Sequence, residues 1–204
     1  MTEKKLVVVV GDRVGKTTLV NALMQKDILP QTANGYEYPT HDCVCLRMTE
    51  QVYLTDTPGY DLIRYKIPWV TADAVSRADT VIVMLTGESC MVSDLDPDAP
   101  AMREREAMLL EQLLELQKNR DVYFVIPFDL TDWDDMEVPR EQWLRSARKG
   151  FSHFTDHGEA GFFCIDPMLA LIGALETDQQ ELEDSGIMPL RAALTGEDRS
   201  GGQV

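Results

Sequence analysis

The chain has 204 residues, of which 44% are hydrophobic and 26% charged, a size and balance typical of one globular domain. No stretch approaches the roughly 18 to 20 unbroken apolar residues that a membrane-spanning helix needs. The net charge is −16, and neither half of the chain offers a surplus of Lys and Arg: residues 1–120 carry 18 acidic and 13 basic residues, and residues 121–204 carry 17 and 6. Because a nucleic-acid backbone or an anionic membrane requires a basic face, we expect neither as a partner, and a protein partner instead.

The two ends of the chain predict a cytoplasmic protein without a membrane anchor. The N-terminus has no signal-peptide core, Thr2 stands where myristoylation needs glycine, and no cysteine lies near the C-terminus for prenylation. The cysteines show no paired spacing of the zinc or redox kind. Cys43 and Cys45 alternate with aliphatic residues, so we expect them to be buried or half-buried on one face of a strand.

The predicted elements alternate between strands and helices along the chain. Leu6–Val10 is a continuous aliphatic run, as expected of a central strand that is buried on both faces. Further strands are expected at 43–48, 51–55, 80–85, 122–126 and 162–165, helices at 16–25, 70–76, 101–118, 139–150, 168–176 and 188–194, and long loops at 26–41 and 87–100. This order predicts an α/β fold with a mainly parallel sheet and helices on both faces. We expect a single domain over residues 1–195 and a flexible tail over 196–204.

The strongest motif is the strand–turn–helix at residues 6–18, Leu-Val-Val-Val-Val-Gly-Asp-Arg-Val-Gly-Lys-Thr-Thr. A glycine turn between a buried strand and a helix points backbone N–H groups and the positive end of the helix dipole at one spot, which suits phosphate. The ammonium of Lys16 is expected to reach the β and γ phosphates, and the hydroxyl of Thr17 to ligate Mg²⁺. The residues predicted to contact the nucleotide here are Gly11, Asp12, Arg13, Val14, Gly15, Lys16, Thr17 and Thr18.

A second motif, Thr55-Asp56-Thr57-Pro58-Gly59, follows a predicted strand. A carboxylate at a strand end beside a phosphate loop can hold the Mg²⁺ shell, so Asp56 is predicted to act with Thr17 at the metal. Gly59 has no side chain, which would let its backbone N–H approach the terminal phosphate.

With these two motifs, residues 5–195 resemble the translation-factor-like class of P-loop GTPases, and most closely the Era- and TrmE-like bacterial domains. The resemblance implies the three-layer P-loop NTPase fold, GTP or GDP with Mg²⁺ as cofactors, and a nucleotide-dependent switch. The family's switch threonine, which closes on Mg²⁺ and the γ-phosphate, maps to Thr40, with Thr32 as the alternative.

The guanine-reading loop of the family, Asn-Lys-x-Asp, is only partly matched here. Asp129 keeps the carboxylate that would read the guanine edge, whereas Pro127 replaces the lysine, and Phe128 could stack on the base in its place. The base-side Ser-Ala loop corresponds either to residues 164–167 or to residues 185–187.

The phosphate loop departs from the family spacing. Only three residues separate Gly11 from Gly15, where the family has four, so either the loop is one residue shorter or the strand runs one residue further. A shorter loop would lose or redirect one phosphate-facing N–H group, so we expect weaker nucleotide binding than is usual in the family.

Residues expected to act in hydrolysis are Arg13, Lys16, Thr40 and Gly59. Tyr60 and Asp61 stand where Ras-like members carry the glutamine that orients the attacking water. Arg13 stands where potassium-activated relatives carry an asparagine, so its guanidinium could supply positive charge in cis, or it could simply point into solvent.

Three functions fit these patterns. The first is a GTP-hydrolysing switch, and the second is a pseudo-GTPase that serves as a non-catalytic protein-interaction module. The third, a small-molecule kinase, leaves the motif that ends at Gly59 unexplained.

Overall fold

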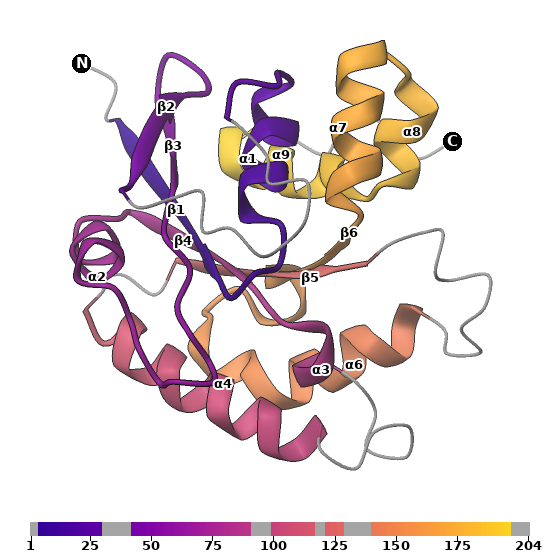
Figure 1. Ribbon diagram of the computed structural model, residues 1–204. Helices are drawn as coiled ribbons and strands as arrows, with labels where there is room; N and C mark the ends of the chain where they lie inside the picture. Colours follow the sequence, from indigo (N-terminus) through magenta and orange to yellow (C-terminus); the bar gives the residue numbers. More distant parts are fainter. Residues whose placement is uncertain (1–3, 30–41, 91–98, 117–120, 129–139, 197–204) are drawn as a thin grey trace.

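The computed structural model describes residues 4–29, 42–90, 99–116, 121–128 and 140–196 (Figure 1). Its centre is a six-stranded sheet in the order β2-β3-β1-β4-β5-β6, and every neighbouring pair is parallel except β2 with β3. The strands are β1 (Lys5–Gly11), β2 (Val44–Arg47), β3 (Val52–Asp56), β4 (Thr80–Met84), β5 (Val122–Pro127) and β6 (Phe162–Ile165). A mainly parallel sheet, as the alternating elements predicted, is therefore confirmed.

Helices cover both faces of this sheet and give the molecule three layers (Figure 1). One face carries α1 (Lys16–Met24), α7 (Pro167–Glu176), α8 (Gln179–Asp184) and α9 (Ile187–Thr195). The other carries α2 (Trp69–Ser76), α3 (Gly87–Cys90), α4 (Ala99–Leu114) and α6 (Arg140–Phe151). Two short 3-10 turns, η1 (Ser152–Phe154) and η2 (Gly158–Gly161), lead from α6 into β6.

Strand β1 shows why the aliphatic run forms the middle of the sheet. Val7 and Val9 face the α1 side and Val8 and Val10 face the α4 side, and all four side chains are fully buried. Burying such a side chain stabilises the fold by roughly 1.5–3 kcal/mol. The two-sided burial therefore accounts for a strand without polar alternation.

Several predictions about elements need correction. Cys45 is exposed because β2 lies at the edge of the sheet, whereas Cys43 is half-buried as expected. The loop expected over 87–100 begins with the short helix α3, and α4 already starts at Ala99. The helix expected over 101–118 ends at Leu114, and Leu116 beyond its end is exposed.

Helix α8 was not predicted because its sequence, Gln-Gln-Glu-Leu-Glu-Asp, lacks an apolar stripe. Its start carries a usable signal, since the carboxylate of Asp178 accepts hydrogen bonds from the backbone N–H groups of Gln180 and Glu181. Over the described ranges, no helix combines the length and the hydrophobicity that crossing a bilayer demands. Residues 197–204, most of the predicted tail, lie outside the described residues.

Candidate functional site

The candidate site lies at the carboxyl ends of β1 and β3. Strand β1 pairs with β3 on one side and with β4 on the other, so the chain order switches at β1. In open parallel sheets, ligands bind outside the carboxyl ends of the strands at such a switch point. The turn after β1 therefore occupies the position where this architecture places its ligand.

That turn is formed by residues 12–15, between the end of β1 at Gly11 and the start of α1 at Lys16. Of the two alternatives for the altered glycine spacing, the structure shows the longer strand: Gly11 still pairs with Met84, and Val10 is buried in the core. Arg13 and Gly15 both adopt left-handed backbone conformations, with φ of 55° and 80°. Gly15 caps α1 without a side-chain hydrogen bond, which leaves the helix N-terminus directed at the site.

Gly11 is required by close packing. A Cβ built on it would lie 2.6 Å from Cγ2 of Val14 and 2.7 Å from the carbonyl oxygen of Met84. Any side chain here would push the turn away from β4, so the backbone can follow this path only with glycine.

Lys16 is buried at the first position of α1, with 9% of its surface exposed. Its Nζ donates a hydrogen bond to the carbonyl oxygen of Gly11 at 3.0 Å. Burial lowers the pKa of this ammonium, and the nearby carboxylates of Asp56 and Asp12 oppose that effect. The chain thus holds a poorly solvated cation over the turn, where an anion would be strongly attracted.

Thr17 and Asp56 meet beside Lys16. The hydroxyl of Thr17 donates to Oδ2 of Asp56 at 2.8 Å, and Asp56 is 1% exposed. A hydroxyl and a carboxylate oxygen are ligands that suit Mg²⁺, which commonly takes only one or two protein carboxylates and completes its shell with phosphate oxygens and water. Within the described ranges, there is no group of three or more His, Cys, Asp or Glu side chains that could hold a metal ion. The donor set therefore fits Mg²⁺ bound together with a phosphate.

Gly59 closes the site from the opposite side. A Cβ built on Gly59 would lie 2.8 Å from the carbonyl oxygen of Gly11 and 3.0 Å from Nζ of Lys16. The loop from β3 to α2 therefore touches the turn after β1, and glycine is needed for that approach.

Two hydrogen bonds hold this loop on either side of Gly59. The hydroxyl of Thr57 donates to the carbonyl oxygen of Val9 at 2.7 Å, and the N–H of Leu62 donates to Oδ2 of Asp12 at 2.9 Å. Burial raises the pKa of Asp12, while the hydrogen bond from Leu62 and the charge of Arg13 lower it in part. Asp12 thus connects the turn to the Gly59 loop, a role that its position in the motif did not suggest.

The remaining predicted residues of the turn are half-buried or exposed. The side chain of Arg13 is 52% exposed, and its Nε lies 3.8 Å from Oδ1 of Asp12. Val14 packs against the core on the α1 side, and Thr18 lies half-buried in the first turn of α1.

Two predicted site residues cannot be placed. Thr40 and its alternative Thr32, and also Asp129, lie outside the described residues. Phe128 is 8% exposed and packs in the core on the α4 side, so the structure does not favour its ring as a platform for the base. The two candidates for the base-side loop lie side by side, since the N–H of Asp166 donates to the carbonyl oxygen of Ser185 at 2.9 Å.

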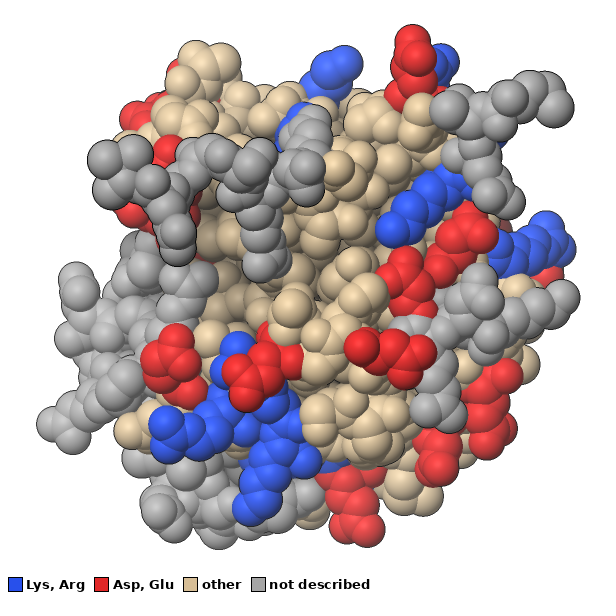
Figure 2. Space-filling view, turned by 180° about the vertical axis from the view of Figure 1, so that it is seen from behind, with Lys and Arg blue, Asp and Glu red and all other residues tan. Residues whose placement is uncertain are grey.

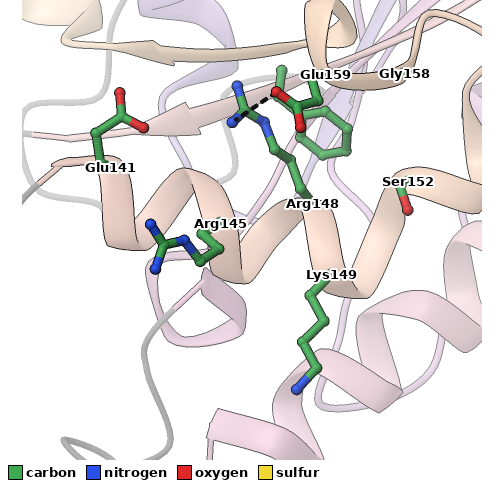
Figure 3. Close-up of a pocket in the computed structure, with 8 residues that line it drawn as sticks. Glu141, Arg145, Arg148, Lys149, Ser152, Gly158 and Glu159 are labelled. Carbon is green, nitrogen blue, oxygen red and sulfur yellow. Dashed lines mark ion pairs between the residues drawn. The ribbon is translucent and has the colours of Figure 1, made fainter.

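A second hollow lies between α6 and η2. This cavity of about 670 Å³ is lined by Glu141, Arg145, Arg148, Lys149, Ser152, Gly158, Glu159 and Phe162. Its cations point in different directions, and Arg148 is paired with Glu159 at 3.6 Å (Figure 3). On the surface of the molecule seen from behind, Lys and Arg side chains gather most densely at the lower left, and Asp and Glu side chains lie beside them (Figure 2). Because its charges do not converge, this hollow is a weaker candidate than the turn after β1.

The chain is similar to known proteins in its sequence pattern and in its fold. The family model described as 50S ribosome-binding GTPase matches residues 6–129. A sequence comparison with curated proteins gives no significant match.

Three solved structures show the same fold, each covering 91% of this chain. Era in complex with MgGDPNP and part of 16S ribosomal RNA has 18% identity and a TM-score of 0.54. A variant of Aquifex aeolicus Era bound to GDP·AlF4⁻ has 18% identity and a TM-score of 0.52. NFeoB from S. thermophilus bound to mGMPPNP has 15% identity and a TM-score of 0.52. This chain spans 57% of both Era chains and 62% of the NFeoB chain.

Proposed function

The chain belongs to the 50S ribosome-binding GTPase family, and from this premise we propose that it binds GTP and GDP with Mg²⁺ and hydrolyses GTP slowly as a molecular switch. The observation that carries the proposal is the convergence of Lys16, Thr17 and Asp56 on the turn after β1. Lys16 and Thr17 come from α1 and Asp56 from β3, and together they provide a cation for phosphate and two oxygen ligands for Mg²⁺.

The proposed roles follow from this geometry. The turn 12–15 and the N-terminus of α1 bind the phosphates, and the Nζ of Lys16 exchanges its bond to Gly11 for the β and γ phosphate oxygens. Thr17 and Asp56 hold Mg²⁺, which when bound neutralises charge on the phosphates. Gly59 brings its N–H to the terminal phosphate and so distinguishes a triphosphate from a diphosphate.

For the hydrolytic step we propose that the chain relies on positioning and charge. Tyr60 is 1% exposed and cannot orient a water beside the nucleotide without leaving the core. Arg13, half-exposed on the turn, can reach the phosphates by rotating its side chain away from Asp12. Thr40 and Asp129 remain the proposed switch and guanine-reading residues.

The ligands bound in the similar structures support a guanine nucleotide. Era binds MgGDPNP in one structure and GDP·AlF4⁻ in another, and NFeoB binds mGMPPNP. One Era structure also contains 16S ribosomal RNA, but this chain spans 57% of that Era chain. Because the chain carries a net charge of −16, we propose that its partner is a protein and not a nucleic acid. We also propose that the two proteins meet in the cytoplasm.

The test is calorimetric titration of the metal-purified protein with GDP, a non-hydrolysable GTP analogue and ADP, each with and without Mg²⁺. We expect micromolar guanine binding that is strengthened by Mg²⁺, and no heat from ADP. Asp56→Asn should abolish the Mg²⁺ effect, whereas the matched control Asp184→Asn, on the exposed face of α8, should leave it intact. The interaction-module alternative predicts no heat with any of the three nucleotides, and that result would reject the switch.

A further inference from the structure

A carboxyl group is fully buried in α4, outside the site described above. The side chain of Glu106 is 0% exposed, because it lies on the face of the helix that packs against the core. The other residues on this face are apolar: Met102, Leu109, Leu110 and Leu113. Sequence reasoning missed Glu106, although its spacing from these residues, four after Met102 and three before Leu109, was a usable signal.

Hydrogen-bond donors from three segments surround this carboxylate. Oε1 accepts from the hydroxyl of Tyr60 at 2.5 Å, and Oε2 accepts from the N–H of Thr86 at 3.3 Å and from its hydroxyl at 3.2 Å. The hydroxyl of Ser89, in α3, also contributes a hydrogen bond and lies 2.8 Å from Oγ1 of Thr86. Glu106 thus joins the Gly59 loop to the end of β4 and to α3.

Such a group is costly to keep in a core. Removing a carboxylate from water carries a penalty that hydrogen bonds only partly offset, and an apolar residue of similar size is often as stabilising or more so. Burial raises the pKa of Glu106, and hydrogen bonds from Ser89, Tyr60 and Thr86 oppose that shift. The neighbouring positions on this face of α4 are leucines, Leu109, Leu110 and Leu113, so packing alone does not account for a glutamate here.

The Tyr60 end of the network points to that role. Tyr60 directly follows Gly59, and the loop between β3 and α2 passes close to α4 (Figure 1). Thr57 anchors the loop two residues before Gly59 through Val9, and Tyr60 anchors it one residue after. Gly59 therefore lies between two anchored residues: Thr57, which is bonded to β1, and Tyr60, which is bonded to α4.

We propose that Glu106 is a positioning residue for the nucleotide response: by holding Tyr60, it sets where Gly59 lies relative to Lys16 and thereby how strongly a triphosphate is preferred over a diphosphate. The inference rests on the proposed function, because it assumes that Gly59 senses the terminal phosphate. Glu106 is fixed in place by α4 and by its bonds to Thr86. Through Tyr60 it holds the loop from Gly59 to Leu62.

The test compares Tyr60→Phe and Glu106→Leu with the unaltered chain. The readout is the ratio of dissociation constants for GDP and for a non-hydrolysable GTP analogue, which a uniform loss of fold stability would not move. Each variant should lower the preference for the triphosphate about threefold to tenfold, the worth of one buried hydrogen bond. Because both changes remove the bond between Tyr60 and Glu106, the double variant should lose no more of this preference than Glu106→Leu alone. Glu106→Gln keeps the size and can still bond to Tyr60, so its ratio should stay within about twofold.

Tyr53→Phe is the matched control, since it removes the hydroxyl of a half-buried tyrosine in β3 and should change nothing. A second readout needs no nucleotide: trypsin cleavage after the exposed residues Arg64 and Lys66 should be faster in Tyr60→Phe and unchanged in Tyr53→Phe.

An unchanged affinity ratio in Tyr60→Phe, with the unaltered chain binding both nucleotides, would overturn the inference and leave the proposed function standing. Unchanged cleavage would overturn it as well. If the unaltered chain bound neither nucleotide, the proposed function would fail and the inference with it.

Discussion

The hydroxyl of Thr17 lies 2.8 Å from Oδ2 of Asp56, although 39 residues separate them along the chain. The parallel pairing of β1 with β3 brings them together, because Val9 pairs with Asp56 and the turn after β1 then places α1 over the end of β3. Two oxygen ligands for one metal ion are thus supplied by two parts of the fold.

Lys16→Met should remove most of the nucleotide affinity and leave the fold intact. A charge-assisted hydrogen bond is worth about 1.5–3 kcal/mol, so the dissociation constant for GTP should rise by about tenfold or more. Since burial lowers the pKa of Lys16, folding disfavours its charged form, and thermal unfolding without nucleotide should occur at the same or a higher temperature. Calorimetry and thermal unfolding check the two effects. Lys26→Met, at an exposed position, is the control, and unchanged affinity in Lys16→Met would show that phosphate binds elsewhere.

Gly59→Ala should impair triphosphate binding more than diphosphate binding. The added Cβ would meet the carbonyl oxygen of Gly11 at 2.8 Å and Nζ of Lys16 at 3.0 Å, so the loop must move away from the turn. We expect about tenfold weaker binding of a GTP analogue and little change for GDP, as measured by calorimetry.

Gly173→Ala is the contrasting change for this prediction. Its Cβ would meet the N–H of Leu182 at 2.9 Å and force α7 away from α8, at a cost of about 1–3 kcal/mol in the free energy of unfolding. The ratio of the two affinities should stay as in the unaltered chain. Equal shifts of that ratio in both glycine variants would mean that stability, and not contact with phosphate, controls it.

Arg13→Ala should slow GTP hydrolysis by about tenfold or more, and replacing Na⁺ by K⁺ should have no effect on the unaltered chain. Arg13→Gly removes the same charge, but glycine suits the backbone φ of 55° and should make the protein more stable than Arg13→Ala by about 1 kcal/mol. Phosphate release measured for both variants separates charge from strain. Stimulation of the unaltered chain by K⁺ would argue against a role for the arginine.

Asp121→Asn should weaken the fold at neutral pH but not in acid. Burial tends to raise the pKa of Asp121, but hydrogen bonds from Thr80 and His157 and the charge of Lys5 lower it overall. A folded-state pKa below the unfolded value adds stability above the unfolded pKa, and this stability is lost as the pH falls through the folded value.

The variant should therefore lose about 1–2 kcal/mol of unfolding free energy at pH 7, and the difference should shrink below about pH 4. Denaturant unfolding across pH measures it, with the exposed Asp156→Asn as control. A difference that stays constant down to pH 3 would contradict the assignment.

Most of the elements and the turn after β1 could be predicted from the sequence alone. Strand β1, the turn 12–15 and α1 could be predicted because their signals are local: an aliphatic run, glycines at the turn and a helical period all lie within 20 residues of one another. The same holds for β6, found at the residues predicted, and for the α/β class, which follows from the alternation of elements. Asp56 and Gly59 could be named because they follow a strand in a recognisable motif.

Which of these residues meet, and which side chains are buried, depends on how distant segments of the chain pack together. Strand order placed Asp56 against Thr17, left Cys45 exposed on an edge strand and buried Phe128 in the core. It also enclosed Glu106, a residue that composition alone would put on the surface. The physical reason is that periodicity reports which residues share a face of one element, whereas burial and contact depend on what packs against that face. In this chain that information lies in the order β2-β3-β1-β4-β5-β6, to which distant segments contribute together.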